Sequence, residues 1–413
     1  MLIIFIIILV IDLISFKGLG LLLKPKSKRV KLVVYIIHWM IPVILFLGVI
    51  LLRRDDQVQN AEKVYKNFIL GGFFLSFYLP KLIFASVHVL DDLMKGLLRL
   101  YTYIVKKPNE NRKEIKGVPI SRMKFITTTG LVLASFNFIS LIYGMVSGRF
   151  NFKTYRLSMR FKGLPEEFNG YTVVQISDLH IGGFYGHGDR LKEAVELINA
   201  EKPDLILFTG DMVNNFADEM TDFKKTLGQL QAKYGKYSIL GNHDYGDYHS
   251  WDSEEEKKEN FKKIVEFQEE MGFNVLLNQS VALKKGNAEI GLIGVENWGK
   301  PPFAQYGNFE KAQNGVSNLP FKILMSHDPS HWDAEITQNT DVHLTLSGHT
   351  HGMQFGVEKG NLKWSPVQYK YPQWAGLYKD GDQYLYVNRG LGTIGYPGRV
   401  GMPPEITVFE LNS

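Results

Sequence analysis

The chain of 413 residues contains no cysteine. It can form no disulfide bond, and a metal site in it must use oxygen and nitrogen ligands, because no thiolate is available. The absence of disulfides is compatible with an extracytoplasmic bacterial domain, although it does not establish one. The sequence also has no visible internal repeat and no long low-complexity segment. We therefore do not expect a repeat array.

Four apolar segments occupy the first 148 residues, and each is close to the roughly 20 residues that a membrane-spanning helix needs. They cover residues 2–23, 32–52, 68–90 and 125–146. Pro42 and Pro80 lie inside two of them and are tolerable in spanning helices. No basic residue precedes the first segment, so we expect no cleaved signal peptide. The alternative is a buried helical bundle in a soluble protein, where apolar runs of this length are unusual.

Basic residues set the expected topology of these segments. The first and third connections carry a basic excess, whereas Arg53, Arg54, Lys63 and Lys66 of the second are partly balanced by Asp55, Asp56 and Glu62. By the positive-inside rule, the first and third connections are cytoplasmic. We therefore expect a multi-pass protein of the cytoplasmic (inner) membrane, with the N-terminus and the residues after 148 on the extracytoplasmic side. The basic residues are Lys24, Lys26, Lys28, Arg29 and Lys31 in the first connection, and Lys95, Arg99, Lys106, Lys107, Arg112, Lys113, Lys116, Arg122 and Lys124 in the third.

The formal net charge of +5 belongs largely to those connections. We therefore do not interpret it as a nucleic-acid-binding patch and expect no nucleic-acid partner. Asp12 and Lys17 lie inside the first apolar segment, where ionisable residues are functional candidates by default. We favour structural roles: Lys17 extends to the interface, and Asp12 faces a neighbouring helix. His38 and His88 are interpreted as packing residues.

The rest of the chain contains five short motifs of Asp, Asn and His residues. Carboxylate and amide oxygens suit Mg or Mn, and imidazoles suit Zn, Fe or Mn. Any one motif alone is weak, because such pairs occur by chance in turns and caps. The order and completeness of the set are what make it informative. The motifs are Asp178-Leu179-His180, Gly210-Asp211, Gly241-Asn242-His243-Asp244, Ser326-His327-Asp328 and Gly348-His349-Thr350-His351.

A short apolar run precedes each motif and predicts a buried strand. These runs cover residues 171–177, 204–209, 237–240, 321–325 and 342–346. Ligands gather beyond the carboxyl ends of strands in open α/β sheets. If the extended geometry persists beyond the strand, Asp178 and His180 point the same way, as do His349 and His351, since side chains alternate with period two.

Residues 170–413 closely resemble the calcineurin-like metallophosphoesterase superfamily. The motif at residues 348–354, with residues 388–392 and 403–406, resembles the bacterial membrane-linked or exported branch of that superfamily. The resemblance implies a four-layer α/β/β/α sandwich, here preceded by an all-α transmembrane region of about four helices. We place the transmembrane region at residues 1–148 and the metallophosphoesterase domain at residues 149–413.

The resemblance also implies two divalent metal ions, with Mn, Zn or Fe as candidates. Metal one takes Asp178, His180, Asp211 and His351. Metal two takes Asp211, Asn242, His327 and His349, so Asp211 bridges the pair. His243 is the expected general acid, and Asp244 either orients it or caps the following turn. A water or hydroxide between the ions attacks phosphorus in line.

The sequence departs from the protein Ser/Thr phosphatase branch. Asn214 and Asn215 stand where that branch has an acidic residue and an arginine, which leaves the phosphate-gripping group unassigned. Arg389 and Arg399 are candidates, with structural surface arginines as the favoured alternative. The aromatic-rich segment 364–378 follows His351. It lines a substrate groove, rests at the lipid interface or packs in the core.

Further elements are expected around the motifs. Helices are predicted at residues 190–200, 219–234 and 254–271, and strands at residues 289–295, 385–387 and 405–410. Residues 149–169 are expected to lead into the domain as a short strand and a turn.

Two classes of function follow. The first is a membrane-anchored metal-dependent phosphohydrolase that acts on a phosphoester or pyrophosphate, either lipid-linked or soluble. The second is a non-catalytic membrane sensor or assembly protein that retains the fold. The intact motif set favours the enzyme, because a degenerate copy loses ligands first.

Overall fold

The structure is a computed structural model that describes residues 2–53, 61–105, 120–360 and 362–413. Its contacts divide the chain into two units, which are described separately. The helical unit comprises Met1–Asp55 and Ile69–Tyr143, and the sheet unit comprises Asp56–Phe68 and Gly144–Ser413. The predicted limits at residues 148 and 149 remain a prediction.

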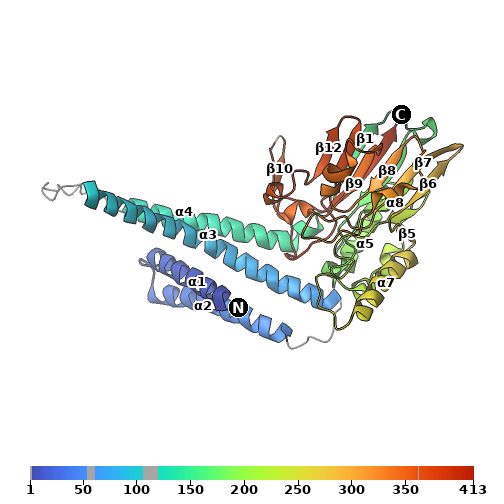
Figure 1. Cartoon of the computed structure of the whole chain (residues 1–413). Coiled ribbons are helices and arrows are strands. Elements are labelled where there is room, and N and C mark those ends of the chain that lie inside the picture. Colours follow the sequence, from blue (N-terminus) through green and yellow to red (C-terminus); the bar gives the residue numbers. More distant parts are fainter. Residues whose placement is uncertain (1, 54–60, 106–119, 361) are drawn as a thin grey trace. The chain divides into compact units, whose positions relative to one another are not determined.

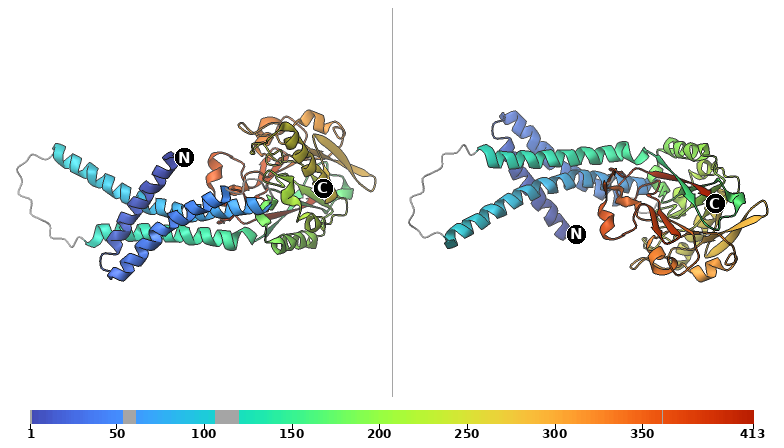
Figure 2. Two further views of the ribbon diagram at one scale, coloured as in Figure 1. Left: turned by 90° about the horizontal axis from the view of Figure 1, so that it is seen from below. Right: turned by 90° about the horizontal axis from the view of Figure 1, so that it is seen from above.

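Four long helices form the N-terminal region (Figures 1 and 2). All four are long and apolar enough to cross a membrane, as the sequence predicted. In the helical unit α3 and α4 lie side by side, and the rings of Phe77 and Phe138 are 5.4 Å apart. The helices are α1 (Leu2–Leu22), α2 (Lys28–Arg53), α3 (Ala61–Val105) and α4 (Ile120–Val146).

Helix α3 is longer than the predicted third span at residues 68–90. Its 45 residues extend for about 68 Å at 1.5 Å per residue, whereas a hydrocarbon core is about 30 Å thick. Several basic residues assigned to connections are therefore helical: Lys63, Lys66, Lys95 and Arg99 on α3, Lys28, Arg29 and Lys31 on α2, and Arg122 and Lys124 on α4. Lys106, Lys107, Arg112, Lys113 and Lys116 lie outside the described residues.

A polar cluster lies among the apolar side chains of the helical unit. Asp12, at the midpoint of α1, is buried and pairs with Lys81 Nζ at 2.5 Å. The Tyr78 hydroxyl donates to the second carboxylate oxygen at 3.0 Å, and His38 Nε2 lies 3.1 Å from the Asp12 backbone oxygen. His38 is buried, as expected for a packing residue, but it also has Asp12 as an acidic neighbour. The cluster ties α1 to α2 and α3.

Replacing Lys81 by methionine is expected to destabilise the helical unit by about 3–5 kcal/mol, because it leaves the buried Asp12 carboxylate without its cation. The double variant Asp12→Leu/Lys81→Met should recover most of that loss. Unfolding of the purified protein in mixed detergent micelles measures both. Lys17→Met is the matched control: Lys17 and Asp92 form an exposed pair, worth about 1 kcal/mol or less. A Lys81→Met protein as stable as the unchanged chain would show that the cluster is not an ion pair of this kind.

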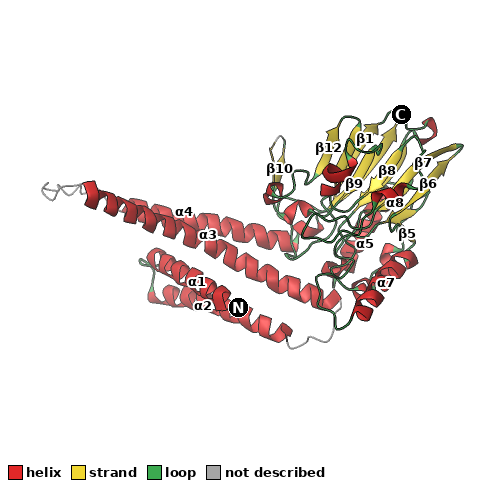
Figure 3. Ribbon diagram, viewed as in Figure 1, coloured by secondary structure: helices red, strands yellow, loops and turns green. Residues whose placement is uncertain are grey.

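The sheet unit contains two six-stranded sheets (Figure 3). The first has the strand order β1-β14-β2-β3-β4-β5 and the second β12-β13-β9-β8-β7-β6. The strands of the first sheet are β1 (Lys153–Arg160), β2 (Tyr171–Ile176), β3 (Leu205–Phe208), β4 (Lys236–Ser238), β5 (Phe273–Val275) and β14 (Glu405–Asn412). Those of the second are β6 (Gln279–Lys285), β7 (Ala288–Gly294), β8 (Lys322–Met325), β9 (Leu344–Ser347), β12 (Gly376–Asp380) and β13 (Gln383–Val387).

Three apolar cores separate four layers. Along β2, Val173 points into the core between the two sheets, and Val174 points to the helices α5 (Gly188–Ala200) and α7 (Glu254–Glu270), because strand side chains alternate. On β8, Ile323 faces the inter-sheet core and Leu324 faces α8 (Phe309–Gln313) and the π-helix η5 (Trp332–Ile336). The predicted α/β/β/α sandwich is confirmed.

The predicted helix at residues 219–234 is wrong. The structure has a 3-10 helix η4 (Ala217–Met220) and a one-turn helix α6 (Lys224–Leu227), followed by Gly228. Glycine is a poor helix former, and the buried Glu219 carboxylate is turned toward the backbone of residues 214–216. The other predicted helices and strands of this unit are present, with ends shifted by a few residues.

The first residues of α3 belong to the sheet unit. The Tyr65 ring lies 5.6 Å from the His187 ring, and Arg149 Nη2 lies 3.5 Å from the Tyr65 hydroxyl. At the C-terminal end of α4, the carbonyl of Gly144 accepts the backbone N–H of Arg399. The beginning of the third long helix and the end of the fourth are thus both held by the sheet unit.

Candidate metal centre

The predicted ligands lie where strands of the two sheets end. Asp178 follows β2, Asp211 follows β3 and Asn242 follows β4, which are neighbouring parallel strands of the first sheet. His327 follows β8, and His349 and His351 follow β9, which are parallel neighbours in the second sheet. Carboxyl ends of parallel strands meet at one edge of a sheet, which explains why motifs about 170 residues apart converge.

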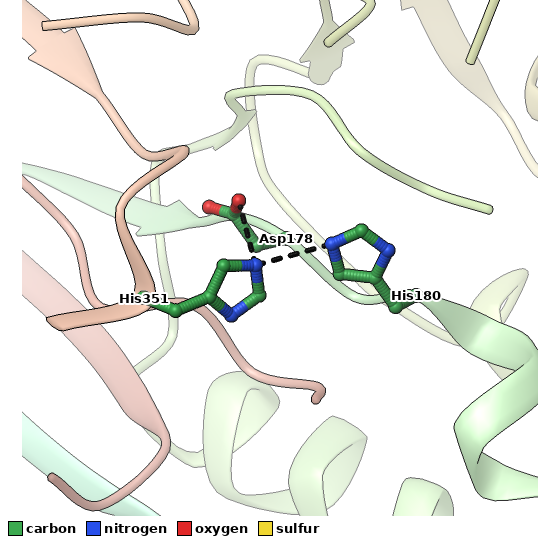
Figure 4. A group of neighbouring side chains, drawn as sticks. All are labelled: Asp178, His180 and His351. Atoms are coloured by element: carbon green, nitrogen blue, oxygen red, sulfur yellow. Dashed lines mark hydrogen bonds and ion pairs between the residues drawn. The ribbon is translucent and has the colours of Figure 1, made fainter. Parts of the chain in front are cut away.

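One group combines Asp178 and His180 from the first sheet with His351 from the second (Figure 4). His180 Nε2 and His351 Nε2 are 3.1 Å apart, and His351 Nε2 is 3.2 Å from an Asp178 oxygen. All three side chains are buried. Two imidazole nitrogens and a carboxylate directed at one point suit a divalent cation between them.

A second group combines Asp211 with His327 and His349. Asp211 Oδ2 lies 3.2 Å from His327 Nε2. The Asn242 side-chain oxygen completes the group, at 3.1 Å from His327 Nε2 and 2.8 Å from His349 Nδ1. All seven predicted ligands are therefore brought together.

Asp211 lies between the two groups. Its Oδ2 atom that faces His327 is also 3.6 Å from His180 Nε2. Its other oxygen accepts the backbone N–H of His243 at 2.9 Å. One carboxylate oxygen thus lies within reach of both groups, as a shared ligand requires.

The donor chemistry fits two borderline divalent ions. Four imidazoles, two carboxylates and one amide oxygen make up the set, which suits Mn, Zn or Fe. Burial lowers the pKa of His180, and it lowers that of His349 to about 4, so these rings are neutral and able to bind a metal. Burial opposes the charge of His327 as well, but the Asp211 carboxylate outweighs it and raises the pKa of His327 to about 10. A cation at this group must displace that proton.

Five of the ligands have left-handed backbone conformations, and this corrects the expectation of continued extended geometry. Positive φ angles cost non-glycine residues roughly 1–3 kcal/mol each and persist only where the surrounding structure holds them. His349 and His351 consequently join different groups instead of pointing the same way. The φ angles are 51° at Asp178, 42° at His180, 61° at Asp211, 71° at His349 and 52° at His351.

Two glycines allow the strands to approach the centre closely. A Cβ atom at Gly241 would lie 2.3 Å from an Asp211 oxygen, and one at Gly348 would lie 2.2 Å from an Asp178 oxygen. Neither position has space for a larger residue without displacing a ligand.

His243 lies beside the centre but in neither group. Its ring is perpendicular to that of His180, with centroids 4.9 Å apart. Its Nδ1 is 2.8 Å from the backbone oxygen of Asn214, so Nδ1–H donates to that carbonyl and Nε2 is free to carry a second proton. The ring is partly exposed, as a group that meets substrate must be.

Asp244 does not orient His243. Its carboxylate accepts backbone N–H groups of Asp211, Met212, Val213 and Gly241, at 2.9–3.2 Å. Burial and the charge of Asp211 raise the pKa of Asp244 to about 7. Glu219 holds the next three residues of the same loop in the same way, and burial raises its pKa. Two buried carboxylates thus shape the loop that carries Asp211 and the Asn214 carbonyl.

Tyr371 and Tyr248 also contact the ligands, although no motif of the sequence indicated them. The Tyr371 hydroxyl lies 2.8 Å from His349 Nε2, and Asn242 Nδ2 donates to the Tyr248 hydroxyl at 2.8 Å. Such contacts orient metal ligands. Tyr371 lies in the aromatic segment 364–378, whose density of aromatic residues was the only signal available.

Arg389 and Arg399 are both buried, so the interpretation as surface arginines was wrong. Arg389 pairs with Glu405 and Glu358. Arg399 donates to the backbone carbonyls of Arg389, Gly390, Gly392 and Met402. Their hydrogen bonds therefore support the chain around the centre.

Comparisons with known proteins follow the division of the chain. A family model described as "Probable Calcineurin-like phosphoesterase, transmembrane domain" matches residues 1–149, and one described as "Calcineurin-like phosphoesterase" matches residues 171–353. The "Uncharacterized metallophosphoesterase YkuE" of Bacillus subtilis is 35% identical over 258 residues, which cover 60% of this chain and 82% of that protein.

Two further relatives match this chain over different shares of their own length. The "Transmembrane protein with metallophosphoesterase domain" of Danio rerio is 28% identical over 280 residues, 65% of this chain and 60% of that protein. The "Phosphodiesterase YaeI" of Escherichia coli is 28% identical over 297 residues, 71% of this chain and 99% of that protein.

Proposed function

The chain belongs to the calcineurin-like metallophosphoesterase family, and on that premise we propose that it is a membrane-anchored, binuclear metal-dependent phosphohydrolase. The bond that it cleaves is a phosphoester or a phosphoric anhydride. One observation carries the proposal: two ligand groups converge, and the Asp211 oxygen 3.2 Å from His327 in one group is also 3.6 Å from His180 in the other. When bound, the two ions supply Lewis acidity and charge neutralisation at the phosphoryl group.

The chain's own residues supply position and a proton. Asp178, His180, Asp211 and His351 would hold metal one, and Asp211, Asn242, His327 and His349 would hold metal two. His243 is the general acid: the Asn214 carbonyl fixes its Nδ1–H and turns Nε2 toward the leaving group.

The second hypothesis, a non-catalytic sensor or assembly protein with the same fold, is less well supported. A protein without catalysis has no need to keep five strained ligand residues or a partly exposed histidine beside them. Turnover by the metal-loaded protein separates the two hypotheses directly.

The direct test uses the full chain in detergent or proteoliposomes. Metal removal by a chelator should abolish hydrolysis, and Mn, Zn or Fe should restore it. Substrates should include nitrophenyl phosphate, bis(nitrophenyl) phosphate and pyrophosphate; the E. coli relative is named a phosphodiesterase, so diesters belong in the panel. Protein that holds two ions and hydrolyses none of the phosphoesters or anhydrides would overturn the proposal.

We place the protein in the cytoplasmic membrane, with its metal centre on the extracytoplasmic side. The basic excess of the first and third connections supports this orientation. Residues 61–68, the start of α3 directly after the second connection, belong to the same unit as the metal centre. That unit is therefore expected on the side opposite the first and third connections.

Reporter fusions test the orientation. A reporter that is active only outside the cytoplasm should be active when fused after Ser413 and silent when fused near Asn109. A reporter that is active only in the cytoplasm should give the reverse pattern. Cytoplasmic activity after Ser413 would move the chemistry to the other side of the membrane, even if the first helix does not span.

A further inference from the structure

A small β-hairpin in the sheet unit has two chemically different faces. It consists of β10 (Val357–Lys359) and β11 (Leu362–Trp364) and is set apart from both large sheets (Figure 1). Val357 pairs with Trp364 and Lys359 with Leu362, whereas Glu358 pairs with Lys363. Directly opposite residues share a face of an antiparallel pair, and successive residues alternate. One face therefore carries Val357, Leu362, Trp364 and Lys359, and the other carries Glu358 and Lys363.

The Glu358–Lys363 face is fastened to the rest of the unit. Glu358 accepts from Arg389 Nη2 at 2.6 Å. Lys363 Nζ donates to the Ala375 carbonyl and lies 4.9 Å from the centre of the Trp374 ring. The hairpin is thus held in a fixed orientation by its polar face, which directs the apolar face outward.

The apolar face is left exposed. Val357 is 37% exposed, Leu362 58% and Trp364 41%. Met353 and Tyr369, on the adjoining 3-10 helices η6 (His351–Gln354) and η7 (Pro366–Tyr369), are 52% and 81% exposed. We call these five side chains the hairpin patch. From residue 147 onward, the only other exposed large hydrophobic side chains among the described residues are Leu197, Tyr248, Tyr306 and Leu377.

The chain segment that carries the hairpin patch also contacts the metal centre. Met353 is two residues from His351, and Tyr371, two residues from Tyr369, contacts His349. Ser365 Oγ donates to the Gly352 carbonyl at 2.8 Å, and Thr350 Oγ1 donates to the Trp374 carbonyl at 2.7 Å. Whatever covers the hairpin patch therefore lies next to the segment that supplies two ligands.

We infer that the hairpin patch inserts into the headgroup–acyl boundary of the lipid bilayer, and that the centre acts on phosphate groups of amphiphilic molecules held in that bilayer. The inference about the substrate rests on the proposed function. Tryptophan, tyrosine and aliphatic side chains interleaved with lysine are the composition of interfacial membrane contacts. Lys359 on the patch face and Lys370 beside Tyr369 complement anionic headgroups, and no acidic residue stands on the patch face of the hairpin.

A second copy of the chain fits the patch less well. From their exposed fractions, the five side chains offer on the order of 500 Å², taking about 200 Å² for a large side chain. A stable protein interface buries about 800 Å² on each partner. A chain already anchored by membrane helices has a bilayer always at hand, so a small patch is enough to orient it.

The absence of cysteine allows a direct test of insertion. Leu362→Cys gives the full chain a single thiol for an environment-sensitive dye, and Lys192→Cys on the exposed side of α5 is the matched control. In vesicles of phosphatidylcholine and phosphatidylglycerol, brominated lipids should quench the dye at position 362 several-fold more than at position 192. Equal quenching overturns the insertion. Shielding at position 362 that rises with protein-to-lipid ratio identifies a second copy instead, and overturns it too.

The inference about the substrate is tested by a ratio of two hydrolysis rates. Leu362→Glu/Trp364→Glu should lower hydrolysis of phosphatidic acid in vesicles relative to hydrolysis of soluble nitrophenyl phosphate by roughly ten-fold. Leu197→Glu, an apolar-to-acidic change on α5, should leave the ratio as it is. An unchanged ratio in the double variant overturns the lipid substrate. Inactivity of the unchanged, metal-loaded chain on these two substrates, and on the diester and pyrophosphate of the panel above, overturns the proposed function, and dye quenching alone then decides the insertion.

Discussion

Replacement of Asp211 by alanine is expected to remove both metal ions and to reduce hydrolysis to background. Its carboxylate oxygen lies 3.2 Å from His327 Nε2 and 3.6 Å from His180 Nε2, so its loss opens both ligand groups at once. Changes that only orient a ligand cost about 10–100-fold in metal affinity, and loss of a shared ligand should cost more at each site. Elemental analysis of the purified protein, paired with a rate measurement, gives both quantities.

Other variants show whether the effect is specific. Asp178→Ala should weaken the binding of metal one alone. Asp222→Ala, at an exposed aspartate in the loop region after Asp211, should weaken the binding of neither metal. Asp211→Asn preserves the side-chain volume, so this variant separates the loss of the carboxylate from simple misfolding. A fully active protein with at most one ion, or an Asp211→Ala protein with one ion bound as tightly as before, would rule out the shared ligand.

Replacement of His243 by alanine is expected to leave both ions in place and to slow hydrolysis by about 10²–10⁴-fold for substrates with poor leaving groups. His243 belongs to neither ligand group, and its Nδ1 is held by the Asn214 carbonyl. A nitrophenolate leaving group needs no proton, so the loss should shrink for nitrophenyl esters. The leaving-group dependence of kcat, measured with metal content, distinguishes an acid from a ligand.

His349→Ala provides the contrast, because His349 Nδ1 lies with Asn242 in the second group and its loss should remove metal two. His249→Ala, at a partly exposed histidine that packs against Phe216 and Trp251, should affect neither property. An equal loss of rate on good and poor leaving groups in the His243→Ala protein would argue that His243 is not the acid.

The strands that precede the motifs could be predicted because a short run of apolar residues has few stable conformations other than a strand once it is buried. β2, β3, β8 and β9 lie close to where those runs predict them, and each places its motif at the same edge. The assignment of individual ligands to metals is still a prediction from the resemblance. The grouping of Asp178, His180 and His351 agrees with it.

The details that failed depend on contacts distant in sequence or on rare backbone conformations. No local pattern indicates that Asp178 and His349 adopt positive φ angles, because only the surrounding strands hold them there. Glu219 was predicted to begin a long helix, but it lies in the short 3-10 helix η4, and its buried carboxylate accepts loop N–H groups. The partnership of Asp12 with Lys81, 69 residues later, has no sequence signal of its own.

Each ligand group takes side chains from both large sheets, and this has a consequence for folding. Asp178 and His180 follow a strand of the first sheet and His351 a strand of the second, and the other group is divided in the same way. Bound ions would therefore act as cross-links that only the closed sandwich can form. By thermodynamic linkage, free metal at 100 times its dissociation constant adds about 2.7 kcal/mol per site to the stability of the folded sheet unit. Metal supply is thus expected to change the stability of the sheet unit as well as the rate of the proposed hydrolysis.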